Sequence, residues 1–146
     1  GGKYMERKVR VVQYGCGKMS KYTMRYCFEK DAEVVGAIDI NPDIIGKDIS
    51  EIIGDGKNKG VLISSVENAK ELLQNLKPDI CIITTMSLLS DLEEALLLCA
   101  ELGINAITTC EEAFYSWNSN PNLTAKIDAL AKKNNCSRFY YVSPTA

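Results

Sequence analysis

Short apolar runs alternate with longer amphipathic segments along this 146-residue chain. The short runs predict β-strands over residues 8–14, 33–38, 61–63, 79–84, 104–108 and 138–142. The amphipathic segments predict α-helices over residues 18–30, 64–76, 90–102 and 121–134. Residues 41–60 are rich in Gly, Asp, Asn and Lys and predict a loop, which a short helical piece over residues 48–53 interrupts.

Local signals mark where several of these helices begin and end. Ser64 and Ser90 each stand three residues before a glutamate, which is the capping-box signature of a helix start. Pro78 ends the helix that follows Ser64, and Gly103 is expected to be the residue just after the next helix. Asn120-Pro121 combines an N-cap residue with a proline at the first helical position, so it predicts the start of the last helix.

The strict alternation of strands and helices predicts an α/β fold with a doubly wound parallel sheet, the Rossmann fold. The expected strand order is 3-2-1-4-5-6. In such sheets, ligands bind at the carboxyl ends of the strands, at the point where the strand order reverses. We therefore look for the functional residues directly after the predicted strands.

The segment after the first strand has the order of a dinucleotide-binding turn, Gly15-Cys16-Gly17-Lys18-Met19-Ser20. Gly15 permits the sharp turn out of the strand, and Gly17 lets the backbone approach a pyrophosphate. The following helix presents N–H groups and a partial positive charge to that pyrophosphate. Ser20 replaces the third glycine of the pattern and is small enough for close packing of helix and strand. The alternative is that both glycines only form a tight connection between strand and helix.

Asp39 ends the second strand, at the distance from the turn where an acid accepts hydrogen bonds from an adenosine ribose. A carboxylate there favours the ribose hydroxyls of NAD and repels the 2′-phosphate of NADP, so NAD is the expected cofactor. NADP stays an alternative, because Lys47 lies downstream. The other interpretation of Asp39 is that it caps a turn with Asn41-Pro42.

Two further strand ends carry candidate site residues. Thr84, Thr85, Met86 and Ser87 follow the fourth strand, where small hydroxyl side chains can approach the cofactor; the alternative is that Ser87 or Ser90 caps the next helix. After the fifth strand, Thr109 and Cys110 precede Glu111 and Glu112, the candidate catalytic residues, in a loop expected near the nicotinamide. A carboxylate there can bind a substrate ammonium or assist proton transfer, but Glu112 can also complete a capping box with Thr109.

The cysteine and histidine content narrows the chemistry. The six cysteines include no Cys-x-x-Cys pair, and the chain has no histidine, so we expect no metal site and no imidazole base. Cys27, Cys81 and Cys99 lie in apolar runs and are expected to be buried. This usage is typical of a reduced, cytoplasmic protein.

The net charge of −2 and the scattered Lys and Arg residues argue against a nucleic-acid partner. A membrane partner is not expected either, because no apolar stretch approaches the roughly 20 residues that cross a bilayer. We interpret residues 1–7 as an N-terminal tail, in which Gly1 to Tyr4 would be a tag remnant before Met5.

Several motifs together resemble the 2,4-diaminopentanoate dehydrogenases, enzymes similar to dihydrodipicolinate reductases in their N-terminal half. The turn Gly17-Lys18-Met19-Ser20 is similar to the Gly-Arg-Met-Gly turn of the reductases. The motifs that resemble the dehydrogenases are residues 34–39, 46–48 and 108–112, with Trp117 and Asn120-Pro121.

This resemblance implies an NAD(P)-dependent oxidation of a 2,4-diamino acid at C4, followed by hydrolysis of the imine to 2-amino-4-oxopentanoate and ammonia. It implies that Gly15, Cys16, Gly17, Lys18 and Met19 form the pyrophosphate turn and that Asp39 holds the adenosine ribose. Residues 84–87, with Thr109 and Cys110, would line the nicotinamide side.

The same resemblance implies that residues 8–146 are the cofactor-binding domain and that a second domain, absent from this chain, binds the amino-acid substrate. Surface left bare by that domain would promote self-association into a homo-oligomer. Two alternatives stay open: a dihydrodipicolinate reductase-like oxidoreductase, and a non-catalytic NAD-binding module.

Overall fold

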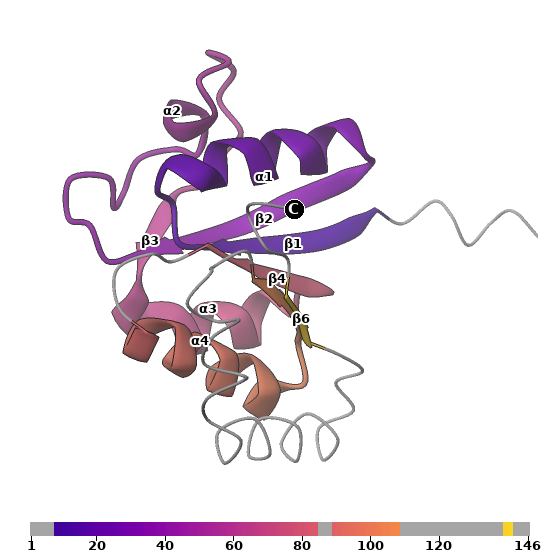
Figure 1. Cartoon of the computed structure of the whole chain (residues 1–146). Coiled ribbons are helices and arrows are strands. Elements are labelled where there is room, and N and C mark those ends of the chain that lie inside the picture. The colour runs from indigo at the N-terminus through magenta and orange to yellow at the C-terminus, as the bar shows by residue number, and fades with distance from the viewer. Residues whose placement is uncertain (1–7, 85–88, 109–138, 142–146) are drawn as a thin grey trace, which may run out of the picture.

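The computed structural model describes residues 8–84, 89–108 and 139–141, which form a parallel sheet with helices on both faces (Figure 1). The 6-stranded sheet has the order β3-β2-β1-β4-β5-β6, and this confirms the predicted fold class and strand order. The strands are β1 Val9–Tyr14, β2 Ala32–Asp39, β3 Ile63–Ser65, β4 Ile80–Ile83, β5 Asn105–Thr108 and β6 Phe139–Tyr141. The helices are α1 Lys18–Glu29, α2 Ser50–Ile53, the 3₁₀ helix η2 Val66–Asn68, α3 Ala69–Leu76 and α4 Leu89–Leu102.

Each face of the sheet has its own apolar layer, because successive strand residues point to opposite faces. Val11 packs with Met24 of α1 on one face. Its neighbour Val12 packs with Leu73 of α3 and Leu96 of α4 on the other. Figure 1 shows the same division, with α1 above the strands and α3 and α4 below them. Burial on both faces explains why the strands are nearly continuous apolar runs.

The third strand lies two residues later than predicted: β3 is Ile63–Ser65, not residues 61–63. Val61 is held instead by the preceding loop, because its N–H donates to Asp48 Oδ2 at 3.0 Å and its carbonyl accepts from the Ile49 N–H at 2.9 Å. Parallel pairing with β2 begins only at Ile63, opposite Ala37. The correction follows from contacts within the loop, which the apolar pattern does not reveal.

The predicted capping box at Ser64 is also wrong by one residue. Ser64 lies inside β3, and Ser65 is the cap, since its Oγ accepts a hydrogen bond from the Glu67 N–H at 3.2 Å. A single 3₁₀ turn follows, and α3 begins only at Ala69. The predicted end is confirmed, because α3 stops at Leu76, two residues before Pro78.

The end of α4 closes as predicted. Gly103 adopts φ 72° and donates its N–H to the Ala100 carbonyl, while the Ile104 N–H donates to the Cys99 carbonyl. These two bonds form a Schellman motif, in which a glycine after the helix satisfies the last carbonyls. The helix predicted over residues 121–134 and the tail 1–7 lie outside the described residues.

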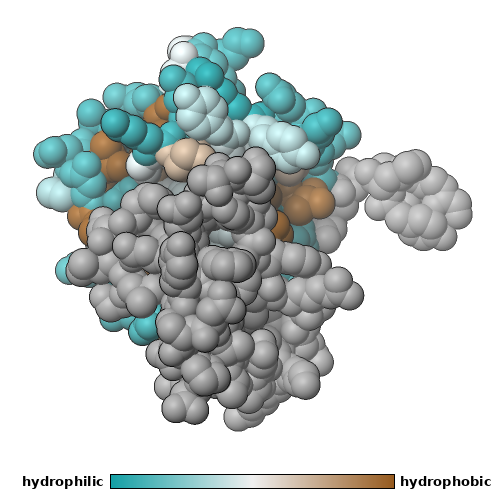
Figure 2. All heavy atoms as spheres, viewed as in Figure 1, coloured by the Kyte–Doolittle hydropathy of each residue, from teal (hydrophilic) through white to brown (hydrophobic). Residues whose placement is uncertain are grey.

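The described surface is mostly hydrophilic on the face drawn in Figure 2, and the apolar colour appears there in small separate patches. The predicted burial of Cys27, Cys81 and Cys99 is confirmed. Within the described ranges, no helix has both the length and the apolar character that crossing a bilayer would require.

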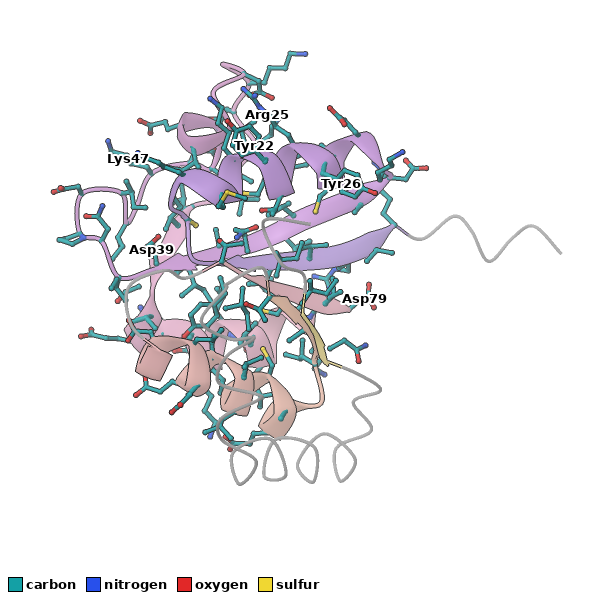
Figure 3. The ribbon with its side chains drawn as sticks, viewed as in Figure 1. Tyr22, Arg25, Tyr26, Asp39, Lys47 and Asp79 are labelled. Carbon is teal, nitrogen blue, oxygen red and sulfur yellow. The ribbon has the colours of Figure 1, made fainter. Side chains whose placement is uncertain are left out.

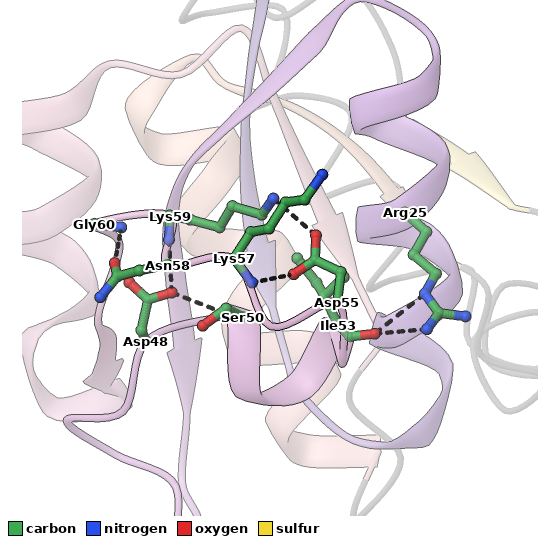
Figure 4. Close-up of polar contacts among 9 residues, drawn as sticks. All are labelled: Arg25, Asp48, Ser50, Ile53, Asp55, Lys57, Asn58, Lys59 and Gly60. Atoms are coloured by element: carbon green, nitrogen blue, oxygen red, sulfur yellow. Dashed lines mark hydrogen bonds and ion pairs between the residues drawn. The ribbon is translucent and has the colours of Figure 1, made fainter.

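Asp48 organises the connection between β2 and β3. Its Oδ1 accepts hydrogen bonds from the N–H groups of Ser50 and Lys59, both at 2.9 Å (Figure 4), and its Oδ2 accepts the bond from Val61. Burial alone would raise the pKa of this carboxyl, but the hydrogen bonds from Lys59, Ser50 and Val61 outweigh burial and lower the pKa from 3.8 to about 2. The ionised side chain is therefore part of the folded structure.

We predict that Asp48→Asn lowers the free energy of unfolding at pH 7 by roughly 1–3 kcal/mol, because part of the backbone donors lose their acceptor. The folded pKa lies below the unfolded one, so the contribution of Asp48 is complete above the unfolded value of 3.8 and is lost as the pH falls through about 2. Urea unfolding between pH 7 and pH 2 measures this, with the exposed Asp43→Asn as control. An Asp48→Asn deficit that stays constant down to pH 2 would contradict the prediction.

Candidate functional site

A cavity of about 470 Å³ lies at the carboxyl ends of β1, β2 and β4. The two neighbours of β1 are reached by opposite windings of the chain, so this is the point where the strand order reverses and where such folds bind ligands. Its size is within the usual range for small-molecule sites. The described residues that line it are Tyr14, Gly15, Cys16, Gly17, Asp39, Ile40, Asn41, Pro42, Ile44, Val66, Thr84, Asp91 and Glu94.

The two positions of the turn hold glycine for different physical reasons. Gly15 adopts φ 96°, a conformation that side-chain-bearing residues rarely take. Gly17 has an ordinary φ of −80°, and a Cβ added there would meet no atom within 4 Å. The protein's own packing therefore does not require glycine at position 17. The missing side chain leaves open space at the rim of the cavity, which a ligand's pyrophosphate would fill.

Helix α1 begins beside this open space without a side-chain cap. Gly17 is its N-cap residue, no side chain accepts a hydrogen bond there, and the first turn contains no acidic residue. The partial positive charge of the helix N-terminus is thus not neutralised by α1 itself. An anionic group of a ligand fits this end of the helix.

Ser20 occupies the third position of the glycine pattern and is fully buried. Its Oγ donates a hydrogen bond to the Gly17 carbonyl at 2.6 Å. The serine therefore meets the demand for a small residue where α1 packs against the sheet, and its hydroxyl is satisfied within the turn.

A buried polar network fastens the turn to β4 and to α1. Gln13, with no exposed surface, donates through Nε2 to the Gly15 carbonyl and to Thr84 Oγ1, each at 2.8 Å. Thr84 Oγ1 donates to the same Gly15 carbonyl at 2.8 Å, and Thr23 Oγ1 donates to Gln13 Oε1 at 2.7 Å. Gln13 and Thr23 are not among the predicted site residues, although a lone amide inside an apolar strand is a signal for such a network.

Asp39 lies at the end of β2, on the side where α1 begins (Figure 3). Its Oδ2 accepts the Cys16 N–H at 2.6 Å, and its Oδ1 accepts the N–H groups of Ile40 at 2.6 Å and Asn41 at 3.0 Å. The turn-capping interpretation of Asp39 is therefore correct, and the same carboxylate also ties the glycine turn to β2. An ionised carboxylate accepts about four hydrogen bonds, so it retains capacity for a ligand hydroxyl.

Two ionisable groups that line the cavity, Cys16 and Tyr14, have raised pKa values. Burial raises the pKa of the Cys16 thiol to about 12, and the nearby Asp39 charge adds to this. Burial likewise raises the pKa of Tyr14 above its usual value, and the surroundings that add to this include Glu94 and Asp91. The raised pKa values favour the neutral form of both groups.

The structure brings together part of the predicted site. Gly15, Cys16, Gly17, Asp39 and Thr84 all line the cavity. Lys18 and Met19 do not; they form the first residues of α1, with exposed side chains. The remaining candidates lie outside the described residues: Thr85, Met86, Ser87, Thr109, Cys110, Glu111 and Glu112. Among the described residues, no group of side chains could hold a metal ion.

Asp91 and Glu94 of α4 line the cavity but are not among the site residues predicted from the sequence. Their spacing of three residues places them on one face of the helix, and this is the signal that could have selected them. With Asp39, they make three carboxylates around the cavity, and the described lining contains no lysine or arginine.

Comparison with known proteins supports the fold and points to one class of relative. No protein-family model and no curated protein sequence matches this chain. A solved amine dehydrogenase from Mycobacterium smegmatis is 36% identical, with a TM-score of 0.80 over 94% of this chain and 39% of its own. This chain therefore spans about two fifths of the length of that enzyme.

Two more distant structures share the fold. A dipicolinate-bound dihydrodipicolinate reductase from Paenisporosarcina sp. TG-14 is 19% identical, with a TM-score of 0.65 over 94% of this chain and 48% of its own. A hyperthermophilic archaeal homoserine dehydrogenase in complex with NADPH is 17% identical, with a TM-score of 0.62 over 95% of this chain and 44% of its own. The chain has the Rossmann-like architecture of these proteins and is most alike to the amine dehydrogenase among the three.

We predict that alanine at the two glycines acts differently. Gly17→Ala meets no steric conflict in the free protein and changes only the N-cap. The free energy of unfolding should therefore fall by at most about 1 kcal/mol. Dinucleotide affinity should fall about tenfold or more, because the methyl group enters the space left for the pyrophosphate. Gly15→Ala should reduce stability itself, by roughly 1–2 kcal/mol of backbone strain.

Thermal melting and calorimetric titration with NAD measure the two effects separately. Equal affinity of Gly17→Ala and the unmodified chain would show that the open space at position 17 does not serve a pyrophosphate.

Proposed function

We propose that this chain is the NAD(P)-binding domain of an amine or amino-acid dehydrogenase and that it prefers NAD. The observation that carries the proposal is the joint placement of Gly15, Gly17 and Asp39 on one cavity at the switch point of the sheet. The similarity to an amine dehydrogenase over 94% of the chain supports the same class.

In the proposed complex, the pyrophosphate lies against the start of α1. Gly17 leaves the space for it, and the uncapped helix terminus supplies N–H groups and partial positive charge. The turn needs no reactive side chain for this task. Cys16, whose thiol is buried and protonated, contributes only its backbone.

The adenosine half would meet Asp39 and the apolar residues that follow it. Ribose hydroxyls donate to the Asp39 carboxylate, and the adenine packs against Ile40, Ile44 and Val66, which line the same cavity. A 2′-phosphate would approach Asp39, in a cavity that Asp91 and Glu94 also line and whose described lining has no basic side chain. Charge repulsion therefore favours NAD over NADP.

The chemistry of the proposed enzyme is amine oxidation. Bound NAD would accept a hydride from the carbon that bears the amino group, and the resulting imine would be hydrolysed to a ketone and ammonia. We propose a 2,4-diamino acid as the substrate class and 2,4-diaminopentanoate as the substrate, on the basis of the sequence motifs. Glu111 and Glu112 stay the candidates for holding the substrate ammonium or moving a proton.

Calorimetric titration of the 146-residue chain with NAD and with NADP tests the cofactor proposal. NAD should bind at least about tenfold more tightly than NADP, which corresponds to about 1.4 kcal/mol. Absence of binding by the folded chain would contradict the proposed function directly.

Asp39→Ala should weaken NAD binding about tenfold, because the ribose loses its acceptor. NADP binding should fall less or rise, since the repulsion of the 2′-phosphate is removed. This ratio separates recognition from collapse of the turn, which would weaken both cofactors equally. Asp43→Asn, which removes an exposed charge nearby, serves as the matched control.

A further inference from the structure

Gln13 is an uncommon residue for its place in the fold. It is fully buried in the central strand β1, next to strand residues that are apolar on both sides of it. Burying an amide costs free energy unless its hydrogen bonds are satisfied. An apolar side chain of the same length would fill this position without that demand, so the amide calls for an explanation.

The side-chain hydrogen bonds of Gln13 end on three elements around the candidate site. One N–H reaches the Gly15 carbonyl in the turn, and the other reaches the Thr84 hydroxyl where β4 ends. The side-chain oxygen accepts from Thr23 in α1. The amide thus joins the turn, the end of β4 and the first helix at one point.

The Gly15 carbonyl is the centre of this arrangement. It accepts two hydrogen bonds at 2.8 Å, one from Gln13 Nε2 and one from Thr84 Oγ1. On the other side of the same residue, the Gly15 N–H donates to the Ile38 carbonyl at 2.8 Å. Both peptide groups of the residue with positive φ are therefore held in place.

We infer that Gln13 is a positioning residue of the dinucleotide turn, which it holds in the binding conformation before the ligand arrives. The inference rests on the proposed function. A turn that is ordered in advance does not have to be ordered at the moment of binding, so more of the contact energy appears as affinity. The same bonds couple the turn to Thr84, the residue from which the chain leaves β4 toward the next candidate residues.

This role differs from simple core stabilisation, because the partners of Gln13 have other bonds. Without the amide, the Gly15 carbonyl still accepts from Thr84, and the Thr23 hydroxyl has the Ser20 carbonyl at 3.0 Å. Replacing Gln13 by an apolar side chain of similar length leaves few buried groups unsatisfied, so its stability cost is small. The substitution should instead make the conformation of the turn less well defined.

The test compares Gln13→Met, Thr84→Val and the double variant by thermal melting and by calorimetric titration with NAD and NADP. Gln13→Met should melt within a few degrees of the unmodified chain and bind NAD about tenfold more weakly. Affinity for NADP should fall by the same factor, because the turn serves the pyrophosphate common to both cofactors. The double variant should bind NAD only slightly more weakly than the single variant with the lower NAD affinity, because both substitutions act on one network.

Val34→Ala is the matched control. It removes buried methyl groups from the neighbouring strand β2, on the face that packs against α1, away from the cavity lining. It should lower the melting temperature by several degrees and leave NAD affinity unchanged below that temperature. A purely structural role of Gln13 would give the same pattern as this control.

The inference is overturned if Gln13→Met, or Thr84→Val where the former does not fold, binds NAD as tightly as the unmodified chain. It is also overturned if Gln13→Met changes the ratio of NAD to NADP affinity in the way expected for Asp39→Ala. If the unmodified folded chain binds neither cofactor, the proposed function fails first, and the inference fails with it. The two failures are therefore distinguishable.

Discussion

The site depends on one constraint: the chain must leave β1 and enter α1 within three residues while both neighbouring strands hold it. The Gly15 N–H and the Cys16 N–H bind to the end of β2, through the Ile38 carbonyl and the Asp39 carboxylate. The Gly15 carbonyl binds to the end of β4 through Thr84. This attachment fixes where α1 starts and which way its N-terminus faces, so the open space at Gly17 follows from it.

Around the cavity, the backbone would attract an anion and the described charged side chains would repel it. Asp39, Asp91 and Glu94 make the described lining acidic, so attraction for a phosphate comes from the start of α1 and not from a lysine or arginine. Backbone N–H groups at a helix end act over a short range and in a fixed direction. In the proposed complex, the pyrophosphate would therefore have to approach the turn closely, and an additional phosphate near the acids would be repelled.

The parts of the site that the sequence predicted are local in the chain. Gly15, Gly17 and Asp39 stand in one strand–helix–strand unit, so their spacing along the sequence already reflects their spacing in the fold. The bond between Gln13 and Thr84 joins residues 71 positions apart, and no periodicity encodes that pairing. The displacement of β3 has the same origin, because the Asp48 carboxylate accepts a hydrogen bond from the Val61 N–H, 13 positions along the chain. Patterns of apolar residues predict which elements form, whereas such side-chain bonds decide where an element begins.

Under the proposed function, the Asp39 carboxylate would serve both the fold and a ligand. Of its three hydrogen bonds from backbone N–H groups, the one from Cys16 is partly buried, whereas those from Ile40 and Asn41 are exposed. A ribose brings two hydroxyl donors to a carboxylate with about four acceptor positions, so one existing bond must be shared or given up. An exposed N–H can turn to water at little cost, but a partly buried one cannot. In the proposed complex, exchange would therefore fall on Oδ1, and the Oδ2 bond that ties the glycine turn to β2 would persist.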